Sequence, residues 1–150
     1  MEKRGAAEQR NSHDPFDQFH CAGGTHPVGV FFVQGGYNKL FGGTAGTVAT
    51  MASHGIPYPG VLVWGAVVVE LGIGLCLMAG LLARWAALAL GTYTLVLAFI
   101  FHAYWLAPAA EARFDRIIFF NHLSVIGGML IVVAFGAGAY SLDAMTGRRH

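Results

Sequence analysis

Glu70 is the residue in this sequence whose position points most directly to chemistry. It lies near the middle of an otherwise apolar run, Val61–Leu82, that is long enough to cross a membrane. A carboxylate at bilayer depth costs at least about 2.5 kcal/mol on insertion scales, so it should face protein or water and have a partner. The sequence therefore predicts that any chemistry is centred on Glu70.

Other polar residues lie near the ends of apolar runs elsewhere in the sequence. If these runs alternate in direction across a bilayer, the polar residues meet in its outer half, with Glu70 roughly 13 Å below the outer end of its run at 1.5 Å per residue. We expect a polar pocket there, in which the candidate catalytic residues are Glu70, His102 and His122. The candidate ligand-binding residues are Lys39, Asn38 and Asn121.

The same residues also have a purely structural interpretation, in which they only hold helices together. Glu70 is either a proton-carrying or ligand-binding carboxylate or a counter-ion to Lys39, whose long side chain can reach the interface. His102 and His122 raise the question of a metal or haem site, because imidazole is the commonest metal ligand. Two lone histidines without a ligand signature more often form hydrogen bonds, so we expect no metal and disfavour haem. Tyr93 is interpreted as a core or aromatic-belt residue.

The composition indicates an integral membrane protein. Of the 150 residues, 55% are hydrophobic and 11% are charged, whereas a soluble domain usually carries about 25% charged residues. A net charge of +1, with lysine and arginine at segment ends, argues against nucleic-acid binding. Cys21 and Cys76 form neither a Cys-x-x-Cys pair nor a zinc-binding spacing, which argues against dithiol chemistry within the chain.

Hydropathy and the distribution of basic residues together predict an all-α membrane protein that folds as an antiparallel bundle of four transmembrane helices. Three runs have the required length of roughly 17–25 residues: Val61–Leu82, Trp85–Leu106, and Ile117 to about Gly138. A further run, His26–Phe41, is shorter and is interrupted by polar residues. We expect Thr44–His54 to form a short interfacial helix that two following prolines end. Glycines that predict close helix approach are Gly65, Gly72, Gly74, Gly91, Gly127 and Gly128.

The positions of the basic residues predict the orientation. With four crossings, both termini and the Arg84 turn share one side, which carries six of the nine basic residues: Lys3, Arg4, Arg10, Arg84, Arg148 and Arg149. The positive-inside rule assigns that side to the cytoplasm. We therefore expect a polar cytoplasmic N-terminal tail over residues 1–25, a membrane domain over 26–140 and a cytoplasmic C-terminal tail over 141–150. The location would be the inner membrane of a prokaryote.

Several motifs of this sequence occur together in one known family. They are Gly36-Tyr37-Asn38-Lys39, Val69-Glu70-Leu71-Gly72-Ile73-Gly74-Leu75, Gly80-Leu81-Leu82-Ala83-Arg84-Trp85-Ala86-Ala87, Phe119-Phe120-Asn121-His122-Leu123, and the stretch from Gly136 to Asp143. Their order and spacing, over about Val28 to Asp143, resemble the DoxX family of small four-helix membrane proteins. This resemblance implies that the weak first run is also a transmembrane helix.

The resemblance implies less about activity. Some members are similar to subunits of quinone-linked sulfur oxidation or terminal oxidase systems, and others are associated with thiol-redox partners. We accordingly expect a membrane subunit of a quinone-linked or thiol-linked redox system, with quinone as the candidate cofactor and an oxidoreductase as the partner. Whether the chain is itself an enzyme is left open. The alternatives are a non-enzymatic scaffold or assembly subunit, and a small-solute carrier that acts as a homo-oligomer.

Overall fold

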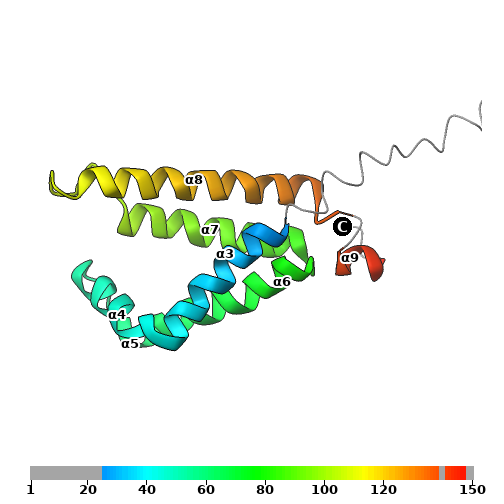
Figure 1. Ribbon diagram of the computed structural model, residues 1–150, viewed down its shortest axis with the longest axis horizontal. Coiled ribbons are helices and arrows are strands. Elements are labelled where there is room, and N and C mark those ends of the chain that lie inside the picture. Colours follow the sequence, from blue (N-terminus) through cyan, green and yellow to red (C-terminus); the bar gives the residue numbers. More distant parts are fainter. Residues whose placement is uncertain (1–24, 139–140, 148–150) are drawn as a thin grey trace, which may run out of the picture.

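The part of the chain that the computed structural model describes, residues 25–138 and 141–147, consists of helices joined by turns and loops (Figure 1). The predicted all-α class is therefore confirmed for these residues. The N-terminal tail, Cys21 and the C-terminal arginines lie outside the described residues. The elements in chain order are α3 (Thr25–Asn38), the segment η1 (Lys39–Gly43), which is kinked at Gly42, α4 (Thr44–Ser53), α5 (Pro59–Val68), the π-helical turn η2 (Val69–Ile73), α6 (Gly74–Ala79), α7 (Ala83–Phe101), α8 (Ala112–Phe135) and α9 (Leu142–Met145).

Three helical stretches are long and apolar enough to cross a membrane. They are Pro59–Ala79, Ala83–Phe101 and Ala109–Phe135, and they correspond to the three strong runs of the sequence. The first of them is formed by α5, η2 and α6 without interruption. Helix α3, with 14 residues, is shorter than the length that a bilayer requires. The short helix expected at Thr44–His54 is present as α4.

The end of α7 differs from the prediction. The sequence predicted a helix to Leu106, but α7 ends at Phe101, and His102 follows it with φ −129° and ψ 35°. The hydropathy of the sequence stays high after Phe101 because the loop that follows α7 is itself rich in aromatic residues. The indole of Trp105 packs on the rings of Phe99 and Phe119 at centroid distances of 5.8 and 5.4 Å. His102 is therefore a loop residue at the end of α7.

The start of α8 also differs from the prediction, which placed it at Ile117. The helix begins at Ala112, about one turn earlier, because Arg113, Asp115 and Arg116 are helical although they lower the hydropathy. It ends at Phe135, where Gly136 adopts φ +81°. This earlier start places Asp115 on a helix face instead of in a loop.

Close packing joins α3 to α6 and η2, and α7 to α8. A Cβ atom on Gly29 would lie 2.7 Å from Met78 Cα, and one on Gly74 would lie 3.0 Å from Phe32 Cβ. Gly91 similarly faces Met129. By contrast, the space beside Gly65, Gly72 and Gly127 is open, so the prediction that these three glycines allow close helix approach was wrong.

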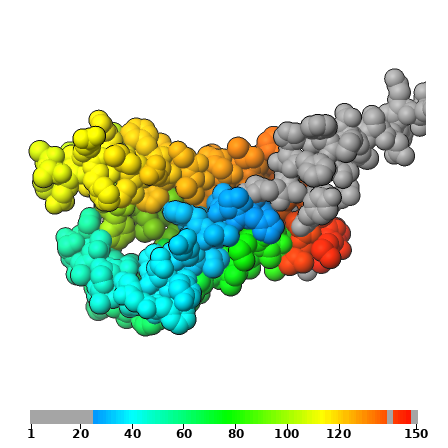
Figure 2. All heavy atoms as spheres, in the orientation of Figure 1, coloured from blue at the N-terminus to red at the C-terminus, as the bar shows by residue number. Residues whose placement is uncertain are grey.

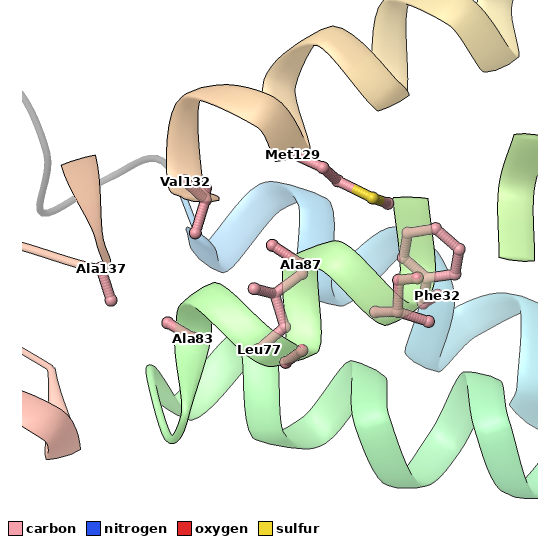
Figure 3. Packing of buried hydrophobic residues seen from close by; sticks show 9 residues of the cluster. Phe32, Leu77, Ala83, Ala87, Met129, Val132 and Ala137 are labelled. Atoms are coloured by element: carbon pink, nitrogen blue, oxygen red, sulfur yellow. The ribbon is translucent and has the colours of Figure 1, made fainter. Parts of the chain in front are cut away.

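The main hydrophobic core lies at the end of the molecule away from α4 (Figures 1 and 3). It joins Phe32 of α3, Leu77 of α6, Leu90 of α7 and Met129 of α8, all of which are buried. At the opposite end, α4 and the start of α8 stand apart and leave a hollow in the molecular surface (Figure 2). The core therefore fixes the helices at one end and leaves the other end open.

The C-terminal segment forms hydrogen bonds with the turn between α6 and α7. The two carboxylate oxygens of Asp143 accept hydrogen bonds from the backbone N–H groups of Leu82 and Ala83 at 2.8 and 2.9 Å. Leu82 has φ +48°, a left-handed conformation that is unusual for leucine. Asp143 thus caps the N-terminus of α7 from a distant part of the sequence.

Candidate functional site

Glu70 lies within the π-helical turn η2, in the middle of the first apolar stretch. It is 4% exposed. π-helical turns inside α-helices occur frequently at functional sites. The sequence did not indicate this turn, because its residues, Val69–Ile73, have ordinary helical composition.

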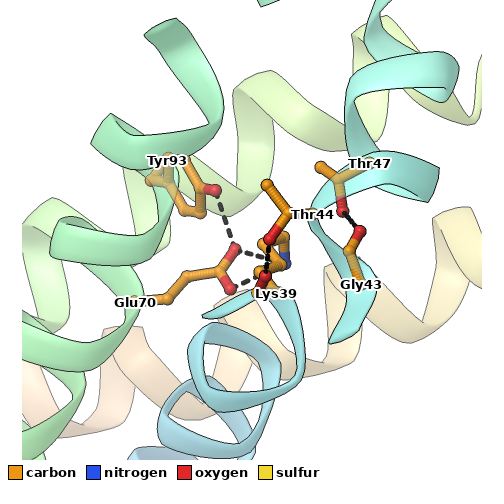
Figure 4. A network of polar contacts seen from close by, with 6 residues as sticks. All are labelled: Lys39, Gly43, Thr44, Thr47, Glu70 and Tyr93. Carbon is orange, nitrogen blue, oxygen red and sulfur yellow. Dashed lines mark hydrogen bonds and ion pairs between the residues drawn. The ribbon is translucent and has the colours of Figure 1, made fainter. Parts of the chain in front are cut away.

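Lys39 pairs with Glu70 through both carboxylate oxygens (Figure 4). Its Nζ lies 2.7 Å from Oε2 and 3.0 Å from Oε1. A buried carboxylate requires such a partner, because an unpaired charge in hydrocarbon is strongly unfavourable. The structure thus brings together two of the residues selected from the sequence, from segments that are 31 positions apart.

Two adjacent glycines on α3 allow this approach. A Cβ atom on Gly36 would lie 2.8 Å from Leu71 Cγ, so the close contact of α3 with η2 depends on a glycine at this position. A Cβ atom on Gly35 would instead lie 3.0 Å from Glu70 Oε2. Gly35 therefore leaves one face of the carboxylate uncovered.

Tyr93 completes the group around the carboxylate. Its hydroxyl donates a hydrogen bond to Glu70 Oε1 at 2.8 Å. The interpretation of Tyr93 as a core or belt residue was therefore incomplete. A tyrosine in the middle of an apolar run offers a signal that sequence reasoning can use, since a buried hydroxyl usually has a hydrogen-bond partner.

A second polar group joins the end of α7 to the start of α8. His102 Nδ1 lies 3.1 Å from Asp115 Oδ1, and the rings of His102 and His122 have centroids 5.2 Å apart. His122 Nδ1 is buried without a hydrogen-bond partner in the described part of the chain. Asp115 was missed because it was assigned to a loop. On a helix it lies seven positions before His122, and this spacing places both on one face.

Both polar groups line one cavity of about 560 Å³ at the open end of the molecule. Of the residues predicted from the sequence, Asn38, Lys39, Glu70, His102 and His122 line it. Asn121 is exposed and is not among the lining residues. Successive helix residues point about 100° apart, and at this position of α8 His122 faces the cavity whereas Asn121 is exposed.

Aromatic side chains form much of the remaining wall. Phe31 and Phe32 come from α3 and Phe101 from α7, and α4 contributes His54 beside Phe101. Within the residues that the structure describes, no group of three or more histidine, cysteine, aspartate or glutamate side chains is placed to hold a metal ion. The arrangement provides flat apolar walls with hydrogen-bonding groups at separate points, which is the general form of a small-molecule site.

These features define a small helical membrane protein with a polar cavity between its helices. The family model for DoxX matches residues 27–103. Inner membrane protein YqjF of Escherichia coli K12 is 32% identical over 120 residues, which cover 80% of this chain and 86% of YqjF. Inner membrane protein YphA of the same organism is 34% identical over 116 residues, covering 77% and 82% of the two chains.

The chain belongs to the DoxX family, and the resemblance seen in its motifs is confirmed. It is a membrane protein whose named relatives are proteins of the bacterial inner membrane. No solved structure matches the chain.

Proposed function

We propose that this protein is a membrane subunit of a quinone-linked or thiol-linked redox system, and that its cavity binds a small ring-containing molecule such as a quinone. The observation that carries this proposal is the convergence of the Lys39–Glu70–Tyr93 group and the His102–Asp115–His122 group on one cavity. Helix pairing alone does not require both polar groups to face the same cavity. In addition, His122 Nδ1 has no hydrogen-bond partner within the described part of the chain.

The size and walls of the cavity suit this class of ligand. Small-molecule pockets usually have volumes of roughly 300–1,000 Å³ and are mainly apolar with a few polar groups, and this cavity has about 560 Å³. The rings of Phe31, Phe32 and Phe101 offer flat surfaces for a planar ring. His122 Nδ1 would bind a hydroxyl or accept a proton from the ligand.

The same groups can move protons. The Asp115 carboxylate orients the His102 ring through Nδ1 and leaves Nε2 available, which is the arrangement used when histidine acts as a general acid or base. The Glu70 carboxylate accepts hydrogen bonds from the Tyr93 hydroxyl and the Lys39 ammonium. It can therefore accept a hydrogen bond from a hydroxyl on the ring of the ligand in place of the one from Tyr93.

The proposed setting is a four-helix antiparallel bundle with both termini in the cytoplasm. Helix α3 continues into η1 as far as the kink at Gly42, so that residues 25–41 extend about 26 Å at 1.5 Å per residue, close to the thickness of the hydrocarbon core. The packing of α3 on α6 and η2 supports its role as the remaining crossing. This orientation puts the cavity in the outer half of the membrane, where a membrane or peripheral oxidoreductase would act as the partner, and copies of the chain could assemble as a homo-oligomer.

The test is ligand binding to the purified protein in lipid nanodiscs. The titrated ligand is an uncharged methylated benzoquinol, the reduced form of the quinone, because its hydroxyl groups can donate hydrogen bonds to Glu70 and to His122 Nδ1. Its binding is followed by the quenching of tryptophan fluorescence. Glu70→Gln keeps size and hydrogen bonding but removes the charge, and His122→Leu removes the unpartnered nitrogen. Asn121→Leu is the matched control, because Asn121 is next to His122 but outside the cavity.

We expect the wild type and Asn121→Leu to bind the quinol, and Glu70→Gln and His122→Leu to remain folded but bind at least about tenfold more weakly, the loss of roughly one hydrogen bond to a charged or buried group. Failure of the wild type to bind would contradict the proposal. Undiminished binding by both variants would assign the polar groups to helix pairing and favour a scaffold. Loss of folded protein in Glu70→Gln, with normal binding by His122→Leu, would make Glu70 a counter-ion only.

A further inference from the structure

The positive charge of Lys39 is already used inside the protein. Within the described part of the chain, Lys39 is the one lysine or arginine that lines the cavity. Its ammonium is held by both carboxylate oxygens of Glu70 at 2.7 and 3.0 Å. Arg113 and Arg116 are on α8, but neither is a lining residue. A negatively charged ligand would therefore find no free permanent cation in the cavity.

The cavity also contains more carboxylates than cations. Besides Glu70, it is lined by Asp115 and Glu111, which lie at the start of α8. Asp115 is bonded to His102, so any positive charge on that imidazole is already paired. Glu111 is exposed and has no ion-pair partner among the described residues. When the histidine side chains are neutral, the charged groups that line the cavity are three carboxylates and one ammonium group.

We infer that the cavity selects an uncharged ring and rejects anions, and that Glu111 and Asp115 at its mouth set this selectivity. The inference rests on the proposed function and deepens it by naming the charge class of the ligand.

The selectivity can be changed at Glu111 without disturbing the helix. Glu111 precedes α8, but its side chain makes no capping hydrogen bond, so Glu111→Gln and Glu111→Lys should leave the fold intact. Each change of one charge near the mouth should alter anion affinity by roughly fivefold at low ionic strength and less at high ionic strength. Arg113→Gln is the matched control, because it changes one charge on the same helix outside the cavity lining.

The experiment compares two probes with the same ring: an uncharged methylated benzoquinol and the same quinol carrying one sulfonate group. Binding to the full chain is measured in nanodiscs of zwitterionic lipid at about pH 8, where histidine side chains are ordinarily neutral. We expect the wild type to prefer the uncharged ring by at least about tenfold. Glu111→Gln should reduce this preference by roughly fivefold and Glu111→Lys by more, whereas Arg113→Gln, which removes a positive charge, should not reduce it.

Equal or tighter binding of the sulfonated ring by the wild type would overturn the inference while leaving the proposed binding function in place. An unchanged preference in Glu111→Lys would also overturn it, because the acidic mouth would then have no effect. Failure of the wild type to bind either ring would instead contradict the proposed function itself.

Discussion

Lys39 and Glu70 form an ion pair between the kinked segment that follows α3 and the π-helical turn η2. Lys39 is the first residue of η1 and Glu70 lies within η2, and Lys39 Nζ is 2.7 and 3.0 Å from the two carboxylate oxygens. A π-helical turn changes the rotation of the residues that follow it relative to a regular helix. The pair therefore joins α3 to the next helix at the points where both helices depart from α geometry.

Removal of Lys39 should destabilise the protein more than removal of both partners. In Lys39→Met, Glu70 remains buried without a counter-ion, and breaking a buried pair in this way costs about 3–5 kcal/mol. Replacing both residues by methionine should restore much of the stability, since well-packed apolar residues can substitute for a buried pair. Thermal unfolding in detergent, followed by circular dichroism, measures the order of the three proteins. A double variant less stable than Lys39→Met would show that the pair has no such coupling.

Tyr93→Phe should lower the free energy of unfolding by about 1.5–3 kcal/mol, the usual contribution of a hydrogen bond to a charged group. The change removes only the hydroxyl that donates to Glu70. Tyr37→Phe is the control, because Tyr37 is 53% exposed and its ring packs on Phe41 at the surface. Equal stability of the two variants would mean that the Tyr93 hydroxyl contributes nothing to the fold.

Alanine at two adjacent glycines of α3 should have different effects. Gly36→Ala brings a methyl group 2.8 Å from Leu71 Cγ and 3.0 Å from its backbone N, and overpacking of this kind costs about 1–3 kcal/mol. Gly35→Ala covers Glu70 Oε2, so it should weaken quinone binding with a smaller loss of stability.

Gly72→Ala is the control for both glycine variants, because the space beside Gly72 is open. It should keep the melting temperature and the quinone affinity of the wild type. Nanodisc binding and thermal unfolding of the three variants test the distinction. Unaltered binding by Gly35→Ala would show that the ligand does not reach the carboxylate from this side.

Asp143→Ala should destabilise the protein by about 1 kcal/mol, the usual cost of losing a helix N-cap. It removes both acceptors for the backbone N–H groups of Leu82 and Ala83. Asp143→Asn keeps one side-chain oxygen and should lie between the wild type and the alanine variant. Thermal unfolding gives the order of stability of the three proteins. Protease cleavage after Gly138 should increase in Asp143→Ala if the C-terminal segment is released.

Reporter fusions test the proposed topology. A fusion at His150 and another in the loop between α4 and α5, which follows Ser53, should report opposite sides of the membrane. The His150 fusion should be cytoplasmic, because the basic residues are concentrated on that side. Both fusions on one side would exclude four crossings.

Hydropathy predicted the helical class, the three long apolar helices and the short helix α4. These features depend on the free energy of transferring whole segments into lipid, which a sequence average reports well. The same average misplaced the end of α7 and the start of α8. Aromatic loop residues such as Trp105 are apolar without being helical, and Arg116 is helical without being apolar.

The sequence by itself also determined which residues are costly in a membrane, and this was sufficient to select Lys39 and Glu70 before any geometry was known. Only the tertiary structure decided the contacts that complete the site: Tyr93 on the carboxylate, Asp115 on His102, and Asn121 turned away from His122. The physical reason is that the free energy of burying a side chain depends on the residue type and on its depth in the membrane, both of which can be read along the sequence. A contact depends on the rotation of one helix against another, which here is set by the π-helical turn η2 and by the glycines at which α3 packs on η2.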